Sequence, residues 1–487
     1  MKRVKRMNTV LQLIESGTSP RKNRTPFTCR SIRAYLCSSV FLLLTSCAVG
    51  PTYVEPKVET PQAFKEGGAE WRIAQPKDDA PKGKWWEAFG DPVLSGLVEQ
   101  VEVSNQSLVA AEARYRQART SVQAARSQLF PTIGASGGAS RSRRGEGQTH
   151  SSYDLGLDAR WEIDLWGRVR RTIEANQAAA AASQGDLEAA RLSLQAELAT
   201  NYFQLRVTDV QRKLLEDTVV AFERSLTVTH NRYKAGIAAR VDVVQAEAQL
   251  LSTRAQAIDL GATRATLEHA IAVLIGKPPA DFSLPPVDSF APRLPAIPPV
   301  LPSTLLERRP DIAAAERRVA AANARIGVAQ AAYFPTLGLT GSGGFASSAL
   351  SSLISAPSRV WSLGLGLAAT VLDFGARGAE VERTRAAYDE TVANYRQTVL
   401  EAFQEVEDGL STVRILGDAE KIQQDAARAA RESVVLTQNQ YKAGTVSYLN
   451  VVQVQATQLN EDRQTVQLLG RRLAASVALV RALGGSW

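Results

Sequence analysis

The pattern of apolar and polar residues divides the chain after residue 93 into two kinds of segment. In the long segments, apolar residues recur at mainly heptad-like steps without proline, which predicts long amphipathic helices. In the short segments, apolar and polar residues alternate one by one, which predicts strands whose two faces meet different surroundings. The order helix, strand pair, long helix and returning helix occurs twice.

The alternation is strictest at 153–164, where one face is apolar and the other mostly charged. The apolar face consists of Tyr153, Leu155, Leu157, Ala159, Trp161 and Ile163. Its counterpart in the second half consists of Trp361, Leu363, Leu365, Leu367, Ala369 and Val371. An apolar-out, polar-in pattern over about 9–11 residues with aromatic ends is typical of an outer-membrane barrel strand, and a soluble sandwich strand is the alternative.

We predict four such strands, at about 133–141, 153–164, 336–346 and 360–372. Four strands cannot close, because bacterial barrels begin at about eight strands. An open sheet edge in lipid leaves backbone groups without hydrogen bonds, and each such group costs several kcal/mol. A barrel built from this chain must therefore be shared between copies.

The predicted helices are too long for a globular core. One spans about 94–129, and the next runs from Gly167 to Tyr233 before a returning helix at 241–275. At about 1.5 Å per residue, the second helix extends roughly 100 Å. Such helices are coiled-coil elements or spacers. The fold class that we predict is mixed, mainly α, with a two-fold internal repeat.

The repeat is clearest at the two turns between long helices. Residues 231–245 and 439–453 are identical at eight of fifteen positions, with a constant offset of 208. The first turn contains Tyr233, Lys234, Ala235 and Gly236, and the second contains Tyr441, Lys442, Ala443 and Gly444. Glycine suits the left-handed position just past a helix end, so each turn predicts a tight helical hairpin.

We divide the chain into five parts on this basis. Residues 1–46 are a signal peptide, 47–93 an N-terminal lipidated arm, 94–277 the first repeat, 278–302 a proline-rich linker and 303–487 the second repeat.

The basic balance of the chain belongs to its leader. The net charge is +8, and residues 1–46 hold nine basic residues and one acidic residue, so the remainder is formally neutral and a nucleic-acid partner is not expected. An apolar run at 34–44 follows the basic region and ends in Leu44-Thr45-Ser46-Cys47. This ending matches the bacterial lipobox, which implies diacylation of Cys47. A plain signal peptide with an incidental cysteine is the alternative.

Catalytic motifs are not expected to act in this chain. Gly134, Ser136 and Gly138 match the spacing of a nucleophile elbow, but they lie in a glycine-rich strand instead of a strand-to-helix turn. The three histidines, His150, His230 and His269, have no metal-ligand spacing. No phosphate-binding loop occurs in the sequence. We therefore predict no enzyme activity, no cofactor, no catalytic residue and no metal site.

These features together resemble the TolC-type outer membrane factors, specifically the NodT-like lipoprotein branch that serves resistance-nodulation-division efflux pumps. The resemblance rests on the start CAVGPTY at 47–53, the Trp85-Trp86, Phe89 and Asp91-Pro92 motif, both Tyr-Lys-Ala-Gly turns and LLERRPDI at 305–312. It implies a homotrimer with a twelve-stranded barrel in the outer membrane and a helical barrel in the periplasm. The implied partners are a periplasmic adaptor (membrane fusion) protein, an inner-membrane resistance-nodulation-division transporter and outer-membrane lipid.

The resemblance also assigns roles to the turns. They are implied to be periplasmic tips, where Tyr233, Lys234, Gly236, Lys442 and Gly444 form adaptor-docking turns. Asp242 and Tyr441 match residues that close the duct in relatives, and Leu449 matches an apolar constriction.

Two tip positions depart from the pattern of relatives. Val446 replaces an arginine that some relatives carry, so Arg240 is the candidate substitute, and Gln453 replaces an acidic residue. Helix-turn packing, with Asp242 as a helix cap, is the alternative interpretation.

The implied function is passive conduction of small molecules, such as drugs or other toxic compounds, across the outer membrane as part of a tripartite pump. The alternative within this class is the outer-membrane duct of a type I protein secretion system. An outer-membrane enzyme and a coiled-coil scaffold are rivals from other classes. The first lacks a catalytic constellation in the sequence, and the second does not explain the alternating strands.

Overall fold

The structure is a computed structural model that describes residues 48–58, 64–65, 83–143, 145, 147–295 and 308–485. The predicted signal peptide at 1–46, the lipidation site Cys47 and part of the predicted linker lie outside the described residues.

The helices repeat with the offset that the sequence shows. The first half contains α2 (Pro92–Ser104), α3 (Gln106–Ser127), α4 (Arg168–Lys234) and α5 (Arg240–Leu274). The second half contains α7 (Pro310–Ala331), α8 (Ala376–Lys442) and α9 (Tyr448–Ala482). The helices α4 and α8 have 67 residues each, and α5 and α9 have 35 each. The predicted long helices and both hairpin turns are therefore present.

The predicted single helix at 94–129 is wrong, because the chain breaks at Asn105 into α2 and α3. Asn105 has an extended backbone (φ −67°, ψ 119°), and its side chain accepts a hydrogen bond from the Leu108 N–H. Its amide also donates to the Leu274 carbonyl over 2.7 Å. The same buried side chain thus caps α3 at its start and binds the end of α5, which a helical Asn105 could not do.

The four strands form one antiparallel sheet in the order β1-β2-β3-β4. Their bounds are β1 (Thr132–Arg143), β2 (Thr149–Ile163), β3 (Thr336–Ser347) and β4 (Arg359–Ala368). The strand β4 ends before the predicted residue 372, because its last partner is Thr336, the first residue of β3. Pro335 precedes Thr336 and has no N–H to extend the ladder. Val371 therefore lies beyond the sheet and is 94% exposed.

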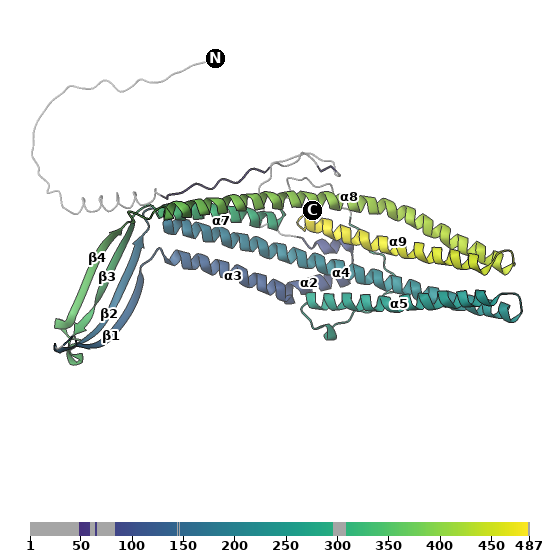
Figure 1. The fold of residues 1–487 in the computed structure, drawn as a ribbon, viewed down its shortest axis with the longest axis horizontal. Coiled ribbons are helices and arrows are strands. Elements are labelled where there is room, and N and C mark those ends of the chain that lie inside the picture. The colour runs from purple at the N-terminus through teal and green to yellow at the C-terminus, as the bar shows by residue number, and fades with distance from the viewer. Residues whose placement is uncertain are drawn as a thin grey trace, which may run out of the picture. The chain divides into compact units, whose positions relative to one another are not determined.

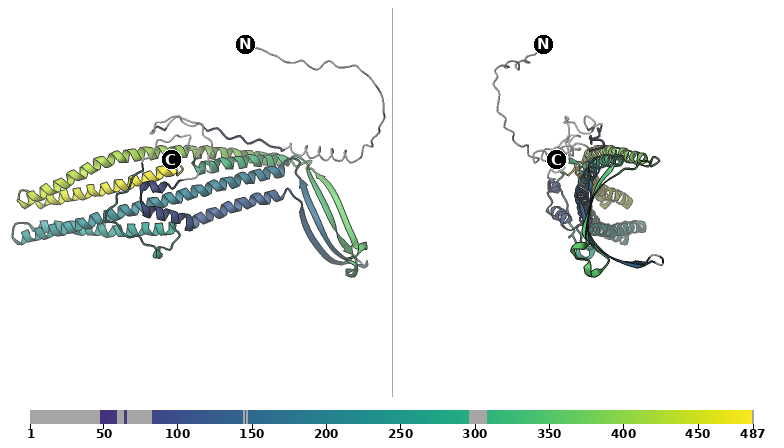
Figure 2. Two further views of the ribbon diagram at one scale, coloured as in Figure 1. Left: turned by 180° about the vertical axis from the view of Figure 1, so that it is seen from behind. Right: turned by 90° about the vertical axis from the view of Figure 1, so that its left-hand side faces the viewer.

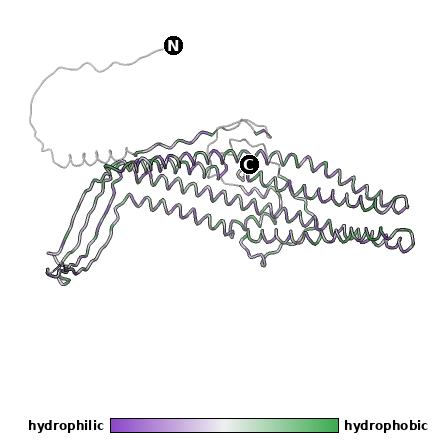
Figure 3. The backbone as a smooth tube through the Cα atoms, viewed as in Figure 1, coloured by the Kyte–Doolittle hydropathy of each residue, from purple (hydrophilic) through white to green (hydrophobic). Residues whose placement is uncertain are grey.

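The sheet lies at one end of the long helices and the two hairpin turns lie at the other (Figures 1 and 2). The helix α4 packs against α3, α5 and α7, and α8 packs against α7 and α9. Contacts of α4 with α7 and α9, and of α5 with α9, join the two halves. Hydrophilic and hydrophobic residues are interspersed along these helices (Figure 3), and none in the described part of the chain is long and apolar enough to cross a membrane.

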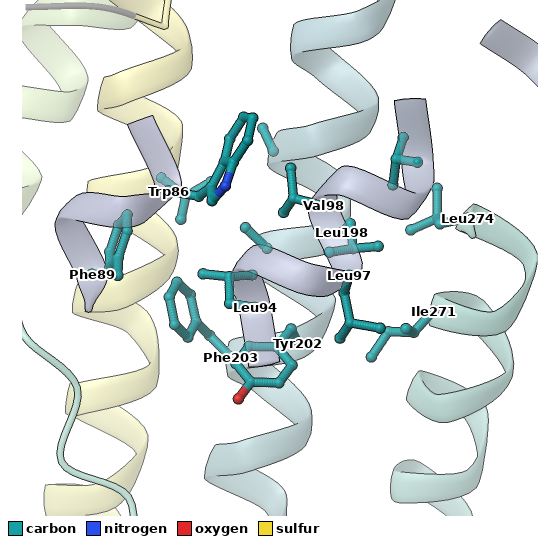
Figure 4. Close-up of a cluster of buried hydrophobic side chains, with 14 of the residues drawn as sticks. Trp86, Phe89, Leu94, Leu97, Val98, Leu198, Tyr202, Phe203, Ile271 and Leu274 are labelled. Carbon is teal, nitrogen blue, oxygen red and sulfur yellow. The ribbon is translucent and has the colours of Figure 1, made fainter. Parts of the chain in front are cut away.

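The largest core of the described residues buries the Trp85-Trp86 motif. Figure 4 shows Trp86 and Phe89 within it. A 3-10 helix, Trp85–Phe89, places Phe89 4.9 Å from Phe203 of α4, measured between ring centroids. Asp91 caps α2 by accepting from Val93 and Leu94, and it also accepts from the Tyr202 hydroxyl at 2.6 Å. The motif thus fixes the N-terminal arm to α4.

Candidate functional site

The two hairpin turns have the same backbone geometry. Gly236 and Gly444 have φ of 73° and 77°, a conformation that a residue with a Cβ adopts only at a cost. The Gly236 N–H donates to the Tyr233 carbonyl and the Ile237 N–H to the Arg232 carbonyl. The second turn repeats both bonds at Gly444 and Thr445. Each long helix therefore ends in a Schellman motif, which reverses the chain within a few residues.

Asp242 caps the returning helix of the first turn. Its side-chain oxygen accepts a hydrogen bond from the Ala239 N–H over 3.2 Å, and Asp242 also lies in the first turn of α5, where an acidic residue favours the helix dipole. Arg240, the first residue of α5, is exposed. The structure thus gives Asp242 the capping role that was the alternative to a gating role.

Tyr441 lies in a buried cluster that joins the two hairpins. Its ring packs against Tyr448, with 5.4 Å between centroids, and the Arg232 guanidinium of α4 lies 4.6 Å from its centre. The Tyr448 hydroxyl lies 3.1 Å from the Ser225 hydroxyl, also on α4. Within the described protomer, the Tyr441 hydroxyl has no hydrogen-bond partner. This cluster holds the second hairpin against the first.

The structure does not join Asp242 to Tyr441 by a hydrogen bond among the described residues of one chain. Leu449 is 48% exposed at the start of α9, where it is free to face another copy. Tyr233, Lys234, Gly236, Lys442 and Gly444 are exposed at the ends of the hairpins. The gate and docking assignments therefore stay predictions.

Two tip residues were missed by the sequence analysis. Tyr448 is 3% exposed, and this burial raises the pKa of its hydroxyl above the ordinary value. Arg232 covers Tyr441. Both positions break the repeat, because Tyr448 corresponds to Arg240 and Arg232 to Gln440. This asymmetry inside an otherwise similar turn is the signal that would have found them.

The sheet has one apolar and one polar face, as predicted. The apolar face is bare in the protomer: Trp361 is 82% exposed, and Leu363 and Leu367 are about as open at 72% and 69%. On the polar face, Asp154 and Asp158 pair with Gly138 and Gly134, and each aspartate side chain occupies the space that a glycine side chain leaves free. An exposed apolar band of this kind is expected to meet lipid, with the polar face toward the lumen.

A sheet with a lipid-facing side, joined to helices of 67 residues that end in paired hairpins, defines an outer-membrane channel with a long helical extension. The family model of the outer membrane efflux proteins matches residues 97–277 and 301–485. The chain belongs to this family.

Individual relatives are similar to this chain over nearly its whole length. The pyoverdine export outer membrane protein OpmQ of Pseudomonas aeruginosa is 32% identical over 463 residues, which cover 92% of this chain and 96% of OpmQ. The antibiotic efflux pump outer membrane protein ArpC of Pseudomonas putida is 30% identical over 91% of this chain and 94% of its own. The structure of the outer-membrane channel OprN is similar with a TM-score of 0.81 at 32% identity, covering 91% of this chain and 100% of OprN.

These comparisons confirm the predicted family and the TolC-like fold with four barrel strands per chain. They also support efflux over protein secretion, since the matched relatives are named for export or efflux. The protein is an outer membrane efflux channel that spans the outer membrane and extends into the periplasm.

Proposed function

We propose that three copies of this chain form the outer-membrane duct of a tripartite pump, which conducts small toxic molecules passively to the exterior. The observation that carries the proposal is the four-stranded sheet, in which the outer edges of β1 and β4 have no partner strand in one protomer. Three copies supply twelve strands, which closes the barrel and removes both edges.

A duct with no energy source of its own needs partner proteins. An adaptor protein docks at the exposed turns, with Tyr233, Lys234, Gly236, Lys442 and Gly444 at the contact, and a resistance-nodulation-division transporter supplies the energy. Export of pyoverdine by OpmQ and of antibiotics by ArpC supports small organic cargo for this chain.

The lipid anchor is proposed at Cys47, after removal of residues 1–46. The position of the next residues supports it. The Val49 N–H donates to the Trp166 carbonyl over 3.0 Å, and Arg171 donates to the carbonyls of Val49 and Gly50. Trp166 lies between β2 and α4, so the first described residues after the proposed anchor are held where the membrane-spanning strands meet the helices. Replacing Cys47 by Ser should abolish labelling of the protein by a palmitate analogue in cells, whereas label on the variant would contradict the anchor.

The gate is proposed at the tips, where Asp242 and Tyr441 approach each other between copies and Leu449 forms an apolar ring. The unpartnered Tyr441 hydroxyl supports this, because a buried hydroxyl without an acceptor carries a cost that a contact in the assembly would remove. Arg240 is exposed beside Asp242 and is the candidate cation at this contact.

Two measurements test the duct, namely the mass of the purified protein and its conductance in bilayers. The full-length protein, purified in mild detergent, should have the mass of three chains by light scattering and should insert into planar bilayers as a channel. Its deletion from the native host should increase sensitivity to several unrelated toxic compounds, and the chain in trans should restore resistance. A folded, inserted monomer would contradict the proposal.

A further inference from the structure

The apolar face of the sheet has the height of an outer-membrane barrel. On β2 it runs from Ile163, near the helices, to Tyr153. The ten residue steps between them, at about 3.3 Å each along a strand tilted by about 40°, give a band about 25 Å tall. Tyr153 on β2, Phe345 on β3 and Trp361 on β4 are the aromatic residues of this face near its far edge, the edge away from the helices.

Three arginines lie on this face at or beyond the level of the aromatic residues. Arg141 pairs with Ser151 and Arg143 with Thr149, so strand alternation places both on the same face as Tyr153. Arg359 is two residues beyond Trp361 on β4, on the same face, and pairs with Phe345 of β3. All three are exposed, and no carboxylate in the described residues pairs with them. The Arg143 Nε does donate to the Gly147 carbonyl over 3.1 Å.

Closure of the barrel brings these arginines together, an inference that rests on the proposed trimer. Arg141 and Arg143 lie on β1 and Arg359 on β4, the two edge strands of the sheet. Because each β4 must pair with β1 of the next copy, Arg359 of one copy faces the same seam as the other two arginines of its neighbour. The polar face is different, since Arg160 there lies 3.6 Å from Asp158.

We propose that each seam binds the phosphate of a phosphorylated lipid in the outer leaflet through Arg141, Arg143 and Arg359. A guanidinium binds phosphate oxygens in a bidentate manner, and it does so most strongly where water is partly excluded. The acyl chains of the same lipid pack on the apolar rows below, which include Leu363 and Leu365. The match of cations above an apolar surface is what selects a lipid over a free anion.

The test measures lipid retention by the purified full-length trimer, using native mass spectrometry. The probes are diphosphorylated lipid A, the same lipid without phosphates, and inorganic phosphate. The variant is Arg141→Gln with Arg143→Gln and Arg359→Gln. The matched control is Arg114→Gln with Arg116→Gln and Arg396→Gln, which removes the same charge from exposed helical positions.

We expect the wild type and the control to bind diphosphorylated lipid A at least about ten-fold more tightly than the triple variant does. We expect both proteins to prefer this lipid over the dephosphorylated lipid by a similar factor. Equal retention by wild type and triple variant would overturn the site, and inorganic phosphate bound as tightly as the lipid would assign it to a free anion instead. Arg359→Gln alone and the Arg141→Gln, Arg143→Gln pair replace the triple variant if it does not fold. A wild type that is not trimeric or does not conduct would contradict the proposed function itself. If the wild type and all variants form conducting trimers that retain the lipid equally, only the lipid site is contradicted.

Discussion

Equivalent residues at the starts of α5 and α9 make different hydrogen bonds and differ in burial. Asp242 caps α5 through the Ala239 N–H, whereas its repeat partner Asn450 accepts from the Ser447 hydroxyl at the start of α9. Next to them, Arg240 is exposed but its partner Tyr448 is buried against α4. The two tips thus share a backbone and differ in side chains, so a trimer of these chains alternates two kinds of tip.

A pH-dependent prediction concerns Tyr395 of α8, which is 4% exposed. Burial, together with the nearby charges of Glu55 and Glu316, raises the pKa of its hydroxyl from 10.0 to about 12. The unfolded chain therefore loses this proton at lower pH than the folded chain, and the stability contribution, full below pH 10, is lost as the pH rises toward 12. This loss is on the order of 2 kcal/mol.

Tyr395→Phe should therefore reduce the fall in unfolding free energy between pH 10 and 12, measured by helical circular dichroism in urea. Tyr333→Phe is the control, because Tyr333 is 50% exposed. The assignment is wrong if both variants follow the wild-type pH profile.

At the scale of elements, a buried ionic cluster holds the linker against α4 and α5. Asp209 accepts from Arg264 over 2.7 Å and from Arg206 over 3.3 Å, and its side chain is 0% exposed. The two arginines also donate to the carbonyls of Leu284 and Pro285 at the start of the linker. The cluster therefore ties the chain between the repeats to the first repeat.

Asp209→Ala should destabilise the protein strongly, by about 3–5 kcal/mol, because it leaves the buried Arg206 guanidinium without its carboxylate. It also removes one of the two carboxylates of Arg264, which keeps Glu268 at 3.2 Å. The linker should also become more sensitive to limited proteolysis. The control is Asp217→Ala, which breaks the exposed Lys213–Asp217 pair (2.6 Å) on the same helix and should cost at most about 1 kcal/mol. Thermal unfolding of both variants measures the difference, and equal losses would show that the cluster has no special role.

At the scale of the whole molecule, the gate that we propose would depend on contacts between copies in the assembly. Asp242→Ala combined with Tyr441→Phe should raise single-channel conductance in planar bilayers and admit vancomycin into cells. A phenol bound to a carboxylate contributes about 1.5–3 kcal/mol when shielded from water, and three copies would act together. Adding Leu449→Ala should widen the passage further by removing an apolar side chain from each copy.

A second variant separates gating from helix capping. Asp242→Asn keeps an oxygen that can accept from the Ala239 N–H but removes the charge. It should raise conductance without destabilising α5. Intact trimers of the triple variant with wild-type conductance would show that other contacts close the tips.

Local patterns in the sequence determined the long helices, the four strands, the two glycine turns and the repeat, because periodicity and turn chemistry act over a few residues. Only the tertiary structure decided the break at Asn105, since the Leu274 carbonyl that binds its amide is far away in sequence. The same holds for the packing of Arg232 on Tyr441, which depends on how the two hairpins pack against each other. The sequence also required the strands to be shared between copies, because unpaired edges are not tolerated in lipid. Which side chains meet across those edges is decided by the strand register between copies, a property of the assembly that no local sequence pattern contains.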